Sequence, residues 1–442
     1  MKTILSVLFA TAVLTSFAVP TVSDVTVSRN TDGSIAIGYK LTDAPAVITL
    51  DLLKDGVSIG EELIQPLEGD VNRKIAEDGI HTIIWRPTLG WPGKVESLKA
   101  SVSAWAMDDT PDYMVVDLRS GLAKTEAARV RYYTSTNALP GGLFANLDYR
   151  SCKLVFRKIE AKDVTWTMGI TGNTGAMTPH EVTLSNNYYM SIFPVTQSQY
   201  TKVAGTGNAT GAGAAWFTWE HTMRVAEKLT YLQARHATSA GSKSCYYPNP
   251  PASNSFFGML RTLVGDSSGS VFDFDFPAES QWEFACRGGH PDGFWGDGSP
   301  IEISSSQDPH LAGLGRYCYN GGKYYNGSSY VNPYAPVGGV VKIPWGVTNA
   351  TPVVGSYRPN SYGLYDMNGS GWEWCLDVYK ADITELNGAV YTPESWDKNF
   401  VVRGGDFQEG ASNCRPGYRT YNDCVNIAGI HAIRVVTRAG LK

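Results

Sequence analysis

From residue 113 onward the sequence offers little regular secondary structure, and this scarcity limits the folds available to it. Four short stretches have helical character, and they begin near Pro194, Thr222, Ser255 and Pro277. Thr196 is a suitable N-cap for the first of them, with Gln199 as its capping-box partner. The stretches between them are loops rich in Gly, Asn, Ser and Tyr. Long ordered loops usually need disulfides or bound calcium to hold them.

The first residues have the pattern of a secretory signal peptide, expected over 1–18. Lys2 is followed by an apolar run from Ile4 to Leu14 and by the cleavage pattern Ser16-Phe17-Ala18. We therefore expect a secreted or periplasmic protein in an oxidising compartment, where cysteines usually form disulfides. The chain has seven cysteines, an odd number. No later run reaches the ~20 apolar residues of a membrane span, so no span is expected after signal removal.

Residues 20–110 have short alternating runs that predict antiparallel strands, among them 34–39, 46–52 and 98–105. Asp55-Gly56 is a hairpin signal. We interpret 20–110 as a small all-β sandwich of immunoglobulin or fibronectin type, acting as a spacer or a docking domain. Residues 111–150 are expected to be a linker or extension, and 151–442 the main α+β domain.

Composition excludes several classes of function. The formal net charge is −5 with a sequence pI near 5.8, and no Lys/Arg cluster stands out, so a nucleic-acid partner is not expected. The chain has only seven histidines, and His221 and His236 lie fifteen positions apart, too far to share a site on one helix. A histidine-built metal centre is therefore not expected.

Four segments, in this order, resemble the formylglycine-generating enzyme or sulfatase-modifying-factor family over about residues 150–440. They are 188–196 (YYMSIFPVT), 276–289 (FPAESQWEFACRGG), 360–374 (NSYGLYDMNGSGWEW) and 403–407 (RGGDF) followed by Arg434-Val435-Val436. The resemblance implies an irregular variant of the C-type-lectin-like fold. It also implies an exported bacterial member, because residues 20–150 resemble the upstream region of such proteins.

The same resemblance implies an oxidase that converts a substrate cysteine to formylglycine with copper held by two thiolates, the ligands that select Cu(I). Counted from Arg403, the second thiolate position is Cys414, which makes it the candidate catalytic residue. The first position is Glu409, and the family's serine after Arg-Gly-Gly is Asp406. A carboxylate is a hard ligand, so copper binding and oxidase activity are not expected.

The resemblance also implies structural roles for cysteines. Relatives without the copper pair carry cysteines at the positions of Cys375 and Cys414, which suggests a disulfide between them, with a free Cys414 thiol as the alternative. Cys286 belongs to a disulfide in related enzymes, and Cys424 or Cys318 could be its partner. Sequence alone leaves this connectivity open.

A calcium site is implied at the loop before Trp372. Transferred residue by residue, Asp366 and Glu373 supply carboxylate oxygens, and Gly369 and Gly371 supply backbone carbonyls, all hard ligands suited to calcium. The alternative is an ordinary Asn-Gly turn with Glu373 in a salt bridge.

In some binding proteins of this fold the segment after Arg-Gly-Gly forms the ligand face. Here that segment mixes aromatic, amide and charged side chains, as adaptable recognition surfaces do. We therefore expect a calcium-stabilised binding or scaffolding protein, with a protein or glycan as the possible ligand. The alternative is a formylglycine-generating oxidase or another enzyme that uses the same pocket. The candidate surface residues are Asp406, Glu409, Asn413, Arg415, Tyr418, Arg419 and Tyr421.

Overall fold

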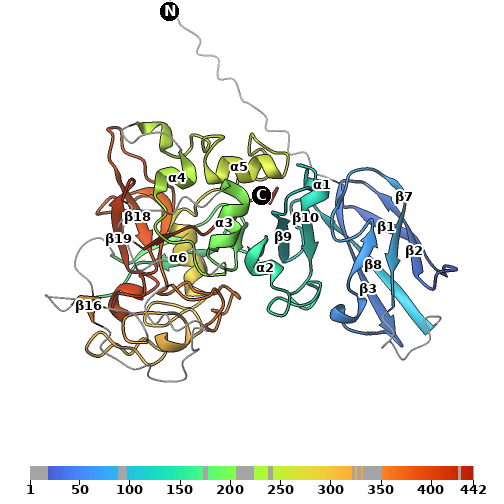
Figure 1. Ribbon diagram of the computed structural model, residues 1–442, viewed down its shortest axis with the longest axis horizontal. Coiled ribbons are helices and arrows are strands. Elements are labelled where there is room, and N and C mark those ends of the chain that lie inside the picture. Colours follow the sequence, from blue (N-terminus) through green and yellow to red (C-terminus); the bar gives the residue numbers. More distant parts are fainter. Residues whose placement is uncertain are drawn as a thin grey trace, which may run out of the picture.

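A computed structural model gives the fold, and it describes residues 18–87, 97–172, 178–205, 223–236, 242–320, 324–325, 330–331, 351–426 and 430–441. The predicted signal peptide lies outside these residues apart from Ala18. The N-terminal strands form one module beside a larger one that contains all the α-helices (Figure 1). In the described part of the chain, no helix is both long and apolar enough to span a bilayer.

Two antiparallel sheets share one core in the N-terminal module, as the alternating sequence predicted. One has the order β1 (Thr21–Arg29), β2 (Ile35–Thr42), β7 (Gly79–Trp85), β5 (Leu67–Gly69). The other contains β4 (Val57–Ser58), β3 (Ala46–Lys54) and β6 (Lys74–Ile75), with β8 (Leu98–Ala106) also paired to β3; η1 is Glu61–Ile64. Alternate residues of β2 are buried, because successive side chains of a strand point to opposite faces. Whether the module is of immunoglobulin or fibronectin type stays a prediction.

The region expected to be a linker or extension is integrated into the larger module. β9 (Tyr113–Asp117) and β10 (Val130–Tyr133) belong to a five-stranded antiparallel sheet of order β10-β9-β11-β14-β21. The other strands are β11 (Lys153–Ile159), β14 (Tyr188–Ser191) and β21 (Val436–Thr437), and the short helices α1 (Glu126–Arg129) and α2 (Asp148–Ser151) lie between strands in the sequence. Two strands within 111–150, β9 and β10, thus belong to the sheet of the larger module.

A second sheet carries the sequence motifs. Its order is β19 (Arg419–Asp423), β18 (Asn399–Arg403), β17 (Trp372–Val378), β20 (His431–Ala432), and β20 runs parallel to β17. Every residue of β17 is buried, as expected for a strand covered on both faces. Two hairpins complete the described strands: β12 (Thr165–Met168) with β13 (His180–Thr183), and β15 (Tyr324–Tyr325) with β16 (Tyr330–Val331).

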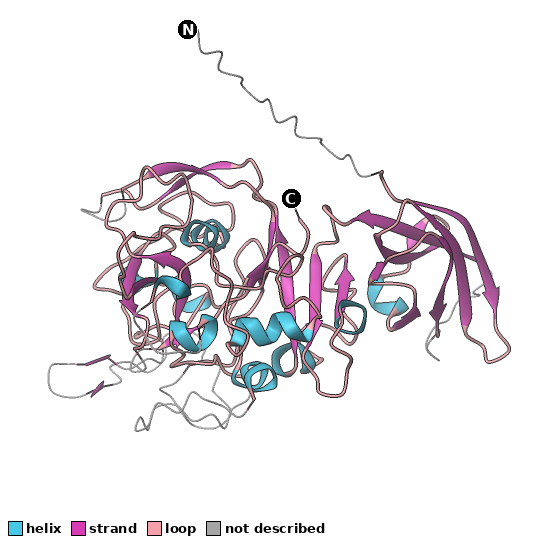
Figure 2. Ribbon diagram, turned by 90° about the horizontal axis from the view of Figure 1, so that it is seen from above, coloured by secondary structure: helices cyan, strands magenta, loops and turns pink. Residues whose placement is uncertain are grey.

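The predicted helices are present but short (Figure 2). They are α3 (Gln197–Ala204), α4 (Tyr231–Arg235), α5 (Phe256–Leu263) and α6 (Glu279–Arg287), with 3₁₀ turns η3 (Lys243–Cys245), η4 (Leu311–Gly313) and η5 (Ala411–Cys414). The Thr196–Gln199 capping box is confirmed. The helix expected over 222–236 begins only after Thr230, which forms a second capping box with Gln233. Lys228 has a φ of 61°, which interrupts a right-handed helix.

Truncation should show whether residues 111–150 are a linker or a structural part of the larger module. A chain that begins at residue 109 keeps β9 and β10 and also the hydrogen bond between Thr110 Oγ1 and Tyr189 Oη. A chain that begins at residue 151 exposes the edge of β11 and lacks Val116 and Tyr132, which belong to the core. We expect cooperative thermal unfolding of the first chain and loss of it in the second, measured by circular dichroism. Equal unfolding of both would contradict the integrated sheet.

Candidate functional site

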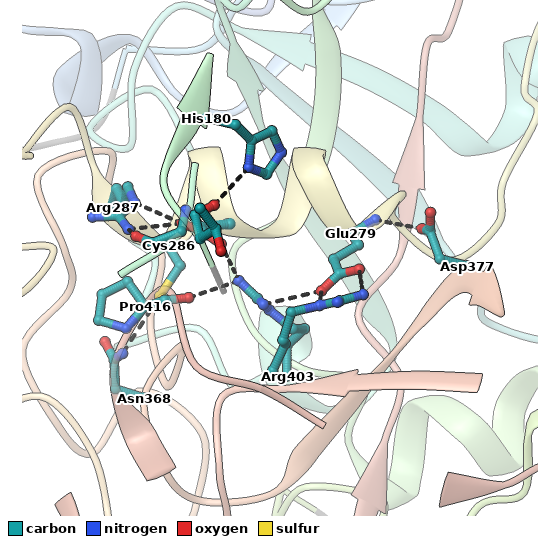
Figure 3. A network of polar contacts seen from close by, with 12 residues as sticks. His180, Glu279, Cys286, Arg287, Asn368, Asp377, Arg403 and Pro416 are labelled. Atoms are coloured by element: carbon teal, nitrogen blue, oxygen red, sulfur yellow. Dashed lines mark hydrogen bonds and ion pairs between the residues drawn. The ribbon is translucent and has the colours of Figure 1, made fainter. Parts of the chain in front are cut away.

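A buried ionic network holds the helix α6 against the second sheet (Figure 3). Arg403 at the end of β18 bridges two acids of α6: its Nη1 lies 3.1 Å from Glu279 Oε1, and its Nη2 contacts Glu283 Oε2. Arg419 Nε donates to Glu279 Oε1 at 2.6 Å, and Arg287 Nη2 donates to Glu283 Oε1 at 2.7 Å. Burial opposes ionisation of Glu283, but Arg287 and Arg403 outweigh it and hold its pKa below the usual value. The network therefore stays charged and fixes the start of the loop that follows Arg403.

The loop after Arg403 folds tightly back on itself because two glycines open it. Gly404 and Gly405 have φ values of 92° and 76°, a region that glycine adopts readily. A side chain at Gly405 would place its Cβ 2.6 Å from Cys414 Sγ. This close approach buries Cys414 in η5, and Asn368 Nδ2 donates to the Cys414 carbonyl oxygen at 2.8 Å. The sequence motif thus packs the thiol into the interior.

The surroundings of Cys414 are acidic. Asp406 is only 6% exposed and accepts a hydrogen bond from Gln408 N at 2.7 Å, while Glu409 Oε2 accepts one from Asn413 Nδ2 at 2.6 Å. Burial raises the pKa of the Cys414 thiol well above its usual value, and Glu409 and Asp406 raise it further. A protonated thiol is a poor nucleophile and a poor metal ligand. The residues at the two aligned copper positions are Glu409 and Cys414. They do not fit a copper ion that is held by two thiolates.

The predicted disulfides are absent, which corrects the sequence-based expectation. All seven cysteines are free and buried. Cys375 on β17 belongs to the same core as Trp282 and Cys286, whereas Cys414 packs with Trp295 in a separate small core. Cys424 lies in a third core, and the Cys286 thiol accepts a hydrogen bond from Asn368 Nδ2 at 3.4 Å. The proposed partners therefore point into different parts of the interior.

The four predicted calcium ligands fit an ion only in part. Glu373 is the counterion of Arg434, whose Nε lies 2.8 Å from Oε2 and whose Nη2 lies 2.8 Å from Oε1, and Trp282 Nε1 donates to it at 2.6 Å. The Gly369 carbonyl accepts a hydrogen bond from Gly371 N at 2.8 Å. Asp366 Oδ1, by contrast, is buried without a hydrogen-bond partner. Among the described residues, no group of three or more His, Cys, Asp or Glu side chains is arranged to hold a metal ion.

The predicted binding surface is only partly on the surface. Asp406 and Arg419 are 6% and 5% exposed, so their inclusion in a ligand face was wrong. Asp406 lies near the buried Cys414 thiol and Arg419 belongs to the ionic network, because the Gly-Gly turn directs this stretch of chain inward. The partly or largely exposed members of the set are Glu409, Asn413, Arg415, Tyr418 and Tyr421.

An open cleft of about 1080 Å³ lies next to residues 409–411, and the sequence did not predict it. Two backbone hydrogen bonds join the segment to one wall of the cleft: Ala411 N to Ser306 O at 2.9 Å and Cys318 N to Glu409 O at 3.0 Å. Aromatic rings and polar side chains both line it, namely Phe144, Tyr317, Tyr319, Tyr357, Tyr365, Glu302, Gln307, Asp308, His310 and Arg358. These residues come from loops without periodicity, so their sequence could not show that they gather at one place.

With this geometry established, comparison with known proteins gives the class. Residues 133–439, more than half of the chain, match the family described as the sulfatase-modifying factor enzyme 1-like domain. The chain belongs to this family.

Two curated relatives match over shorter segments. A formylglycine-generating enzyme of Thermomonospora curvata is 30% identical over 158 residues, 33% of this chain and 43% of the relative. A protein of Chlamydia pneumoniae named serine/threonine-protein kinase pkn1 is 38% identical over 81 residues, 17% of this chain and 13% of the relative. The chain thus spans less than half the length of these relatives.

Two solved structures are also similar. Treponema denticola variable protein 1 has a TM-score of 0.43 and 20% identity, with 65% of this chain and 96% of that one covered. PvdO from Pseudomonas aeruginosa has a TM-score of 0.44 and 18% identity, with 65% and 94% covered.

The carboxyl group of Asp406 should make stability depend on pH. Burial, together with nearby Glu409, raises its pKa from 3.8 to about 8 in the folded chain. Because the folded state holds this proton more tightly, the stabilisation is present below pH 4 and is lost as pH rises toward 8. Asp406→Asn keeps the acceptor for Gln408 N and stays neutral. We expect it to gain stability over the wild type by about 1–3 kcal/mol between these limits.

Urea unfolding at a series of pH values measures this gain. The matched control is Asp108→Asn, which changes an exposed carboxyl group and should show no such trend. A constant difference between Asp406→Asn and the wild type from acid to alkaline pH would contradict the buried, protonated carboxyl.

Proposed function

We propose that this chain is an exported, non-catalytic member of the sulfatase-modifying-factor family that binds a glycan or protein ligand. In this proposal the larger module is a C-type-lectin-like variant, and the two-sheet module is a spacer or dock. One observation carries the loss of catalysis: the buried Cys414 thiol is accompanied by Asp406 and by Glu409, which stands at the aligned first thiolate position. Acidic neighbours disfavour the thiolate that copper needs.

The ligand site in this proposal is the open cleft beside residues 409–411. Phe144 on its rim is 42% exposed, and its ring centroid lies 5.4 Å from that of Tyr365. Exposed aromatic faces next to carboxylates and amides suit sugar rings, which present both apolar C–H faces and hydroxyl groups. A glycan is therefore the ligand class that the lining favours, and a protein is the other.

Removing one aromatic face tests the cleft. Phe144→Ala deletes a half-exposed ring and should leave the fold intact. If the cleft binds glycans, the wild type should bind members of a glycan array, and Phe144→Ala should weaken that binding by about tenfold. Phe294→Ala is the matched control, because Phe294 is 39% exposed and does not line the cleft. Equal binding by Phe144→Ala and wild type, or an array without any bound glycan, would refute the glycan site.

A specific observation also favours the alternative, a copper-dependent oxidase. Cys318 packs in the same small core as Cys414, and its backbone is hydrogen bonded to Glu409. A thiol from another loop could then compensate for the missing cysteine at position 409. Oxidase activity of this kind would require both Cys318 and Cys414, whereas a binding protein would require neither for its ligand.

Calcium stays in the proposal as a stabilising ion at the loop 366–373. Its support is the buried Asp366 Oδ1 without a partner, since an unsatisfied buried acceptor is costly. Burial raises the pKa of Asp366 to about 7, so a proton could satisfy it instead.

Chelation distinguishes an ion from a proton at Asp366. If calcium is bound, EDTA should lower the melting temperature of the wild type by several degrees, and added calcium should restore it. Asp366→Asn should already melt at the lower temperature and should not respond to EDTA. A melting temperature unchanged by EDTA would exclude structural calcium at this loop.

A further inference from the structure

A second cleft, of about 570 Å³, lies among α4, α5, the start of α6 and β21 and shares no lining residue with the aromatic cleft described above. The two helices α4 and α5 lie close together in the larger module (Figure 1). Five charged side chains line it: Arg235, Arg261, Arg438, Asp273 and Asp275. Three cations face two anions, so the lining has an excess of positive charge.

Two of the three arginines are already neutralised. Arg235 Nε lies 2.9 Å from Asp275 Oδ1 and 3.1 Å from Oδ2, and its Nη1 and Nη2 donate to the carbonyl oxygens of Cys245 and Asn249. Arg438 Nε lies 2.6 Å from Asp273 Oδ2. Both carboxylates are therefore committed to a partner.

Arg261 is the third cation, and it shares the Asp275 carboxylate with Arg235. It is only 6% exposed, and Nε donates to the carbonyl oxygen of Phe274 at 3.1 Å. Its Nη2 lies 3.6 Å from Asp275 Oδ2, beyond hydrogen-bond distance. In the described hydrogen bonds, neither Nη1 nor Nη2 of Arg261 donates to any group. A buried guanidinium with unused donors at a cleft can bind an anion with two parallel hydrogen bonds.

Gly269 lies against one side of the guanidinium and leaves room for it because it has no side chain. A Cβ there would lie 2.5 Å from Arg261 Nη1, so any larger residue would displace the arginine. The rest of the cleft wall is mixed: Pro248, Pro250, Phe276 and Val390 supply its apolar part, and serine, asparagine and glutamine side chains supply its polar part. Because the three arginines of the lining exceed its two aspartates by one positive charge, a monoanion matches the site better than a phosphate dianion.

We propose that this cleft binds a carboxylate carried on an apolar body, with Arg261 as the residue that holds the carboxylate. Such a group occurs on a free organic acid and at the C-terminus of a peptide that ends in an apolar residue. The site does not depend on the glycan-binding proposal, because the two clefts have no residue in common.

Fluorine NMR on the full chain tests the assignment with two acids, para-fluorophenylacetate for a free acid and N-acetyl-para-fluorophenylalanine for a peptide C-terminus, each compared with its neutral amide. We expect at least one acid to bind saturably, with its amide about tenfold weaker or more. The stronger of the two acids identifies the source of the carboxylate. Absence of binding by both acids, or equal binding of acid and amide, would overturn the proposal without any variant.

Two variants then assign the binding to Arg261. Arg261→Gln should weaken the acid by about tenfold or more, whereas Arg438→Gln should have little effect, since Arg438 is paired with Asp273 at the same cleft. Circular dichroism establishes that both variants are folded. Undiminished acid binding by folded Arg261→Gln, or an equal loss in Arg438→Gln, would overturn the assignment. If Arg261→Gln fails to fold, the comparison of acid and amide on the wild type still tests whether the chain recognises the carboxylate.

Discussion

The fold of the larger module depends on the buried ion pairs that α6 makes with the second sheet. Arg403 ends β18 and is fully buried, yet both of its α6 partners, Glu279 and Glu283, are also bound by other arginines. Removing one member of such a network leaves an uncompensated charge in the interior, typically at a cost of about 3–5 kcal/mol. The network therefore fixes where the Arg-Gly-Gly turn begins, in a domain that has few regular elements.

A second ion pair connects the two sheets of this module. Arg434 binds Glu373 on β17, and its Nη1 donates to the carbonyl oxygen of Ser191 on β14 at 2.8 Å. Trp282 on α6 joins both systems, because its indole N–H donates to Glu373 and its ring lies 5.3 Å from the guanidinium of Arg403. Buried charge thus performs the task that disulfides were expected to perform.

The sequence was informative where local rules decide the structure and uninformative where tertiary contacts decide it. The capping box at Thr196 and the alternating strand 35–42 follow from neighbouring residues, and both were predictable. The family motifs also singled out Cys414, because their order along the chain is distinctive. The role of Glu373 was left open between calcium and a salt bridge, since its partner Arg434 lies sixty-one positions away. The inward direction of Asp406 and Arg419 and the gathering of tyrosines around the aromatic cleft depend on such long-range packing.

We propose that a carboxylate in place of a cysteine, Glu409 before Cys414, has removed oxidase chemistry from this chain. The most direct measurement is incubation of the full chain with Cu(I), oxygen and a Cys-x-Pro-x-Arg peptide, with mass spectrometry of the peptide. If the chain has lost oxidase chemistry, the peptide cysteine will not be converted to formylglycine. Conversion to the aldehyde by the wild type, lost in Cys414→Ser, would contradict it.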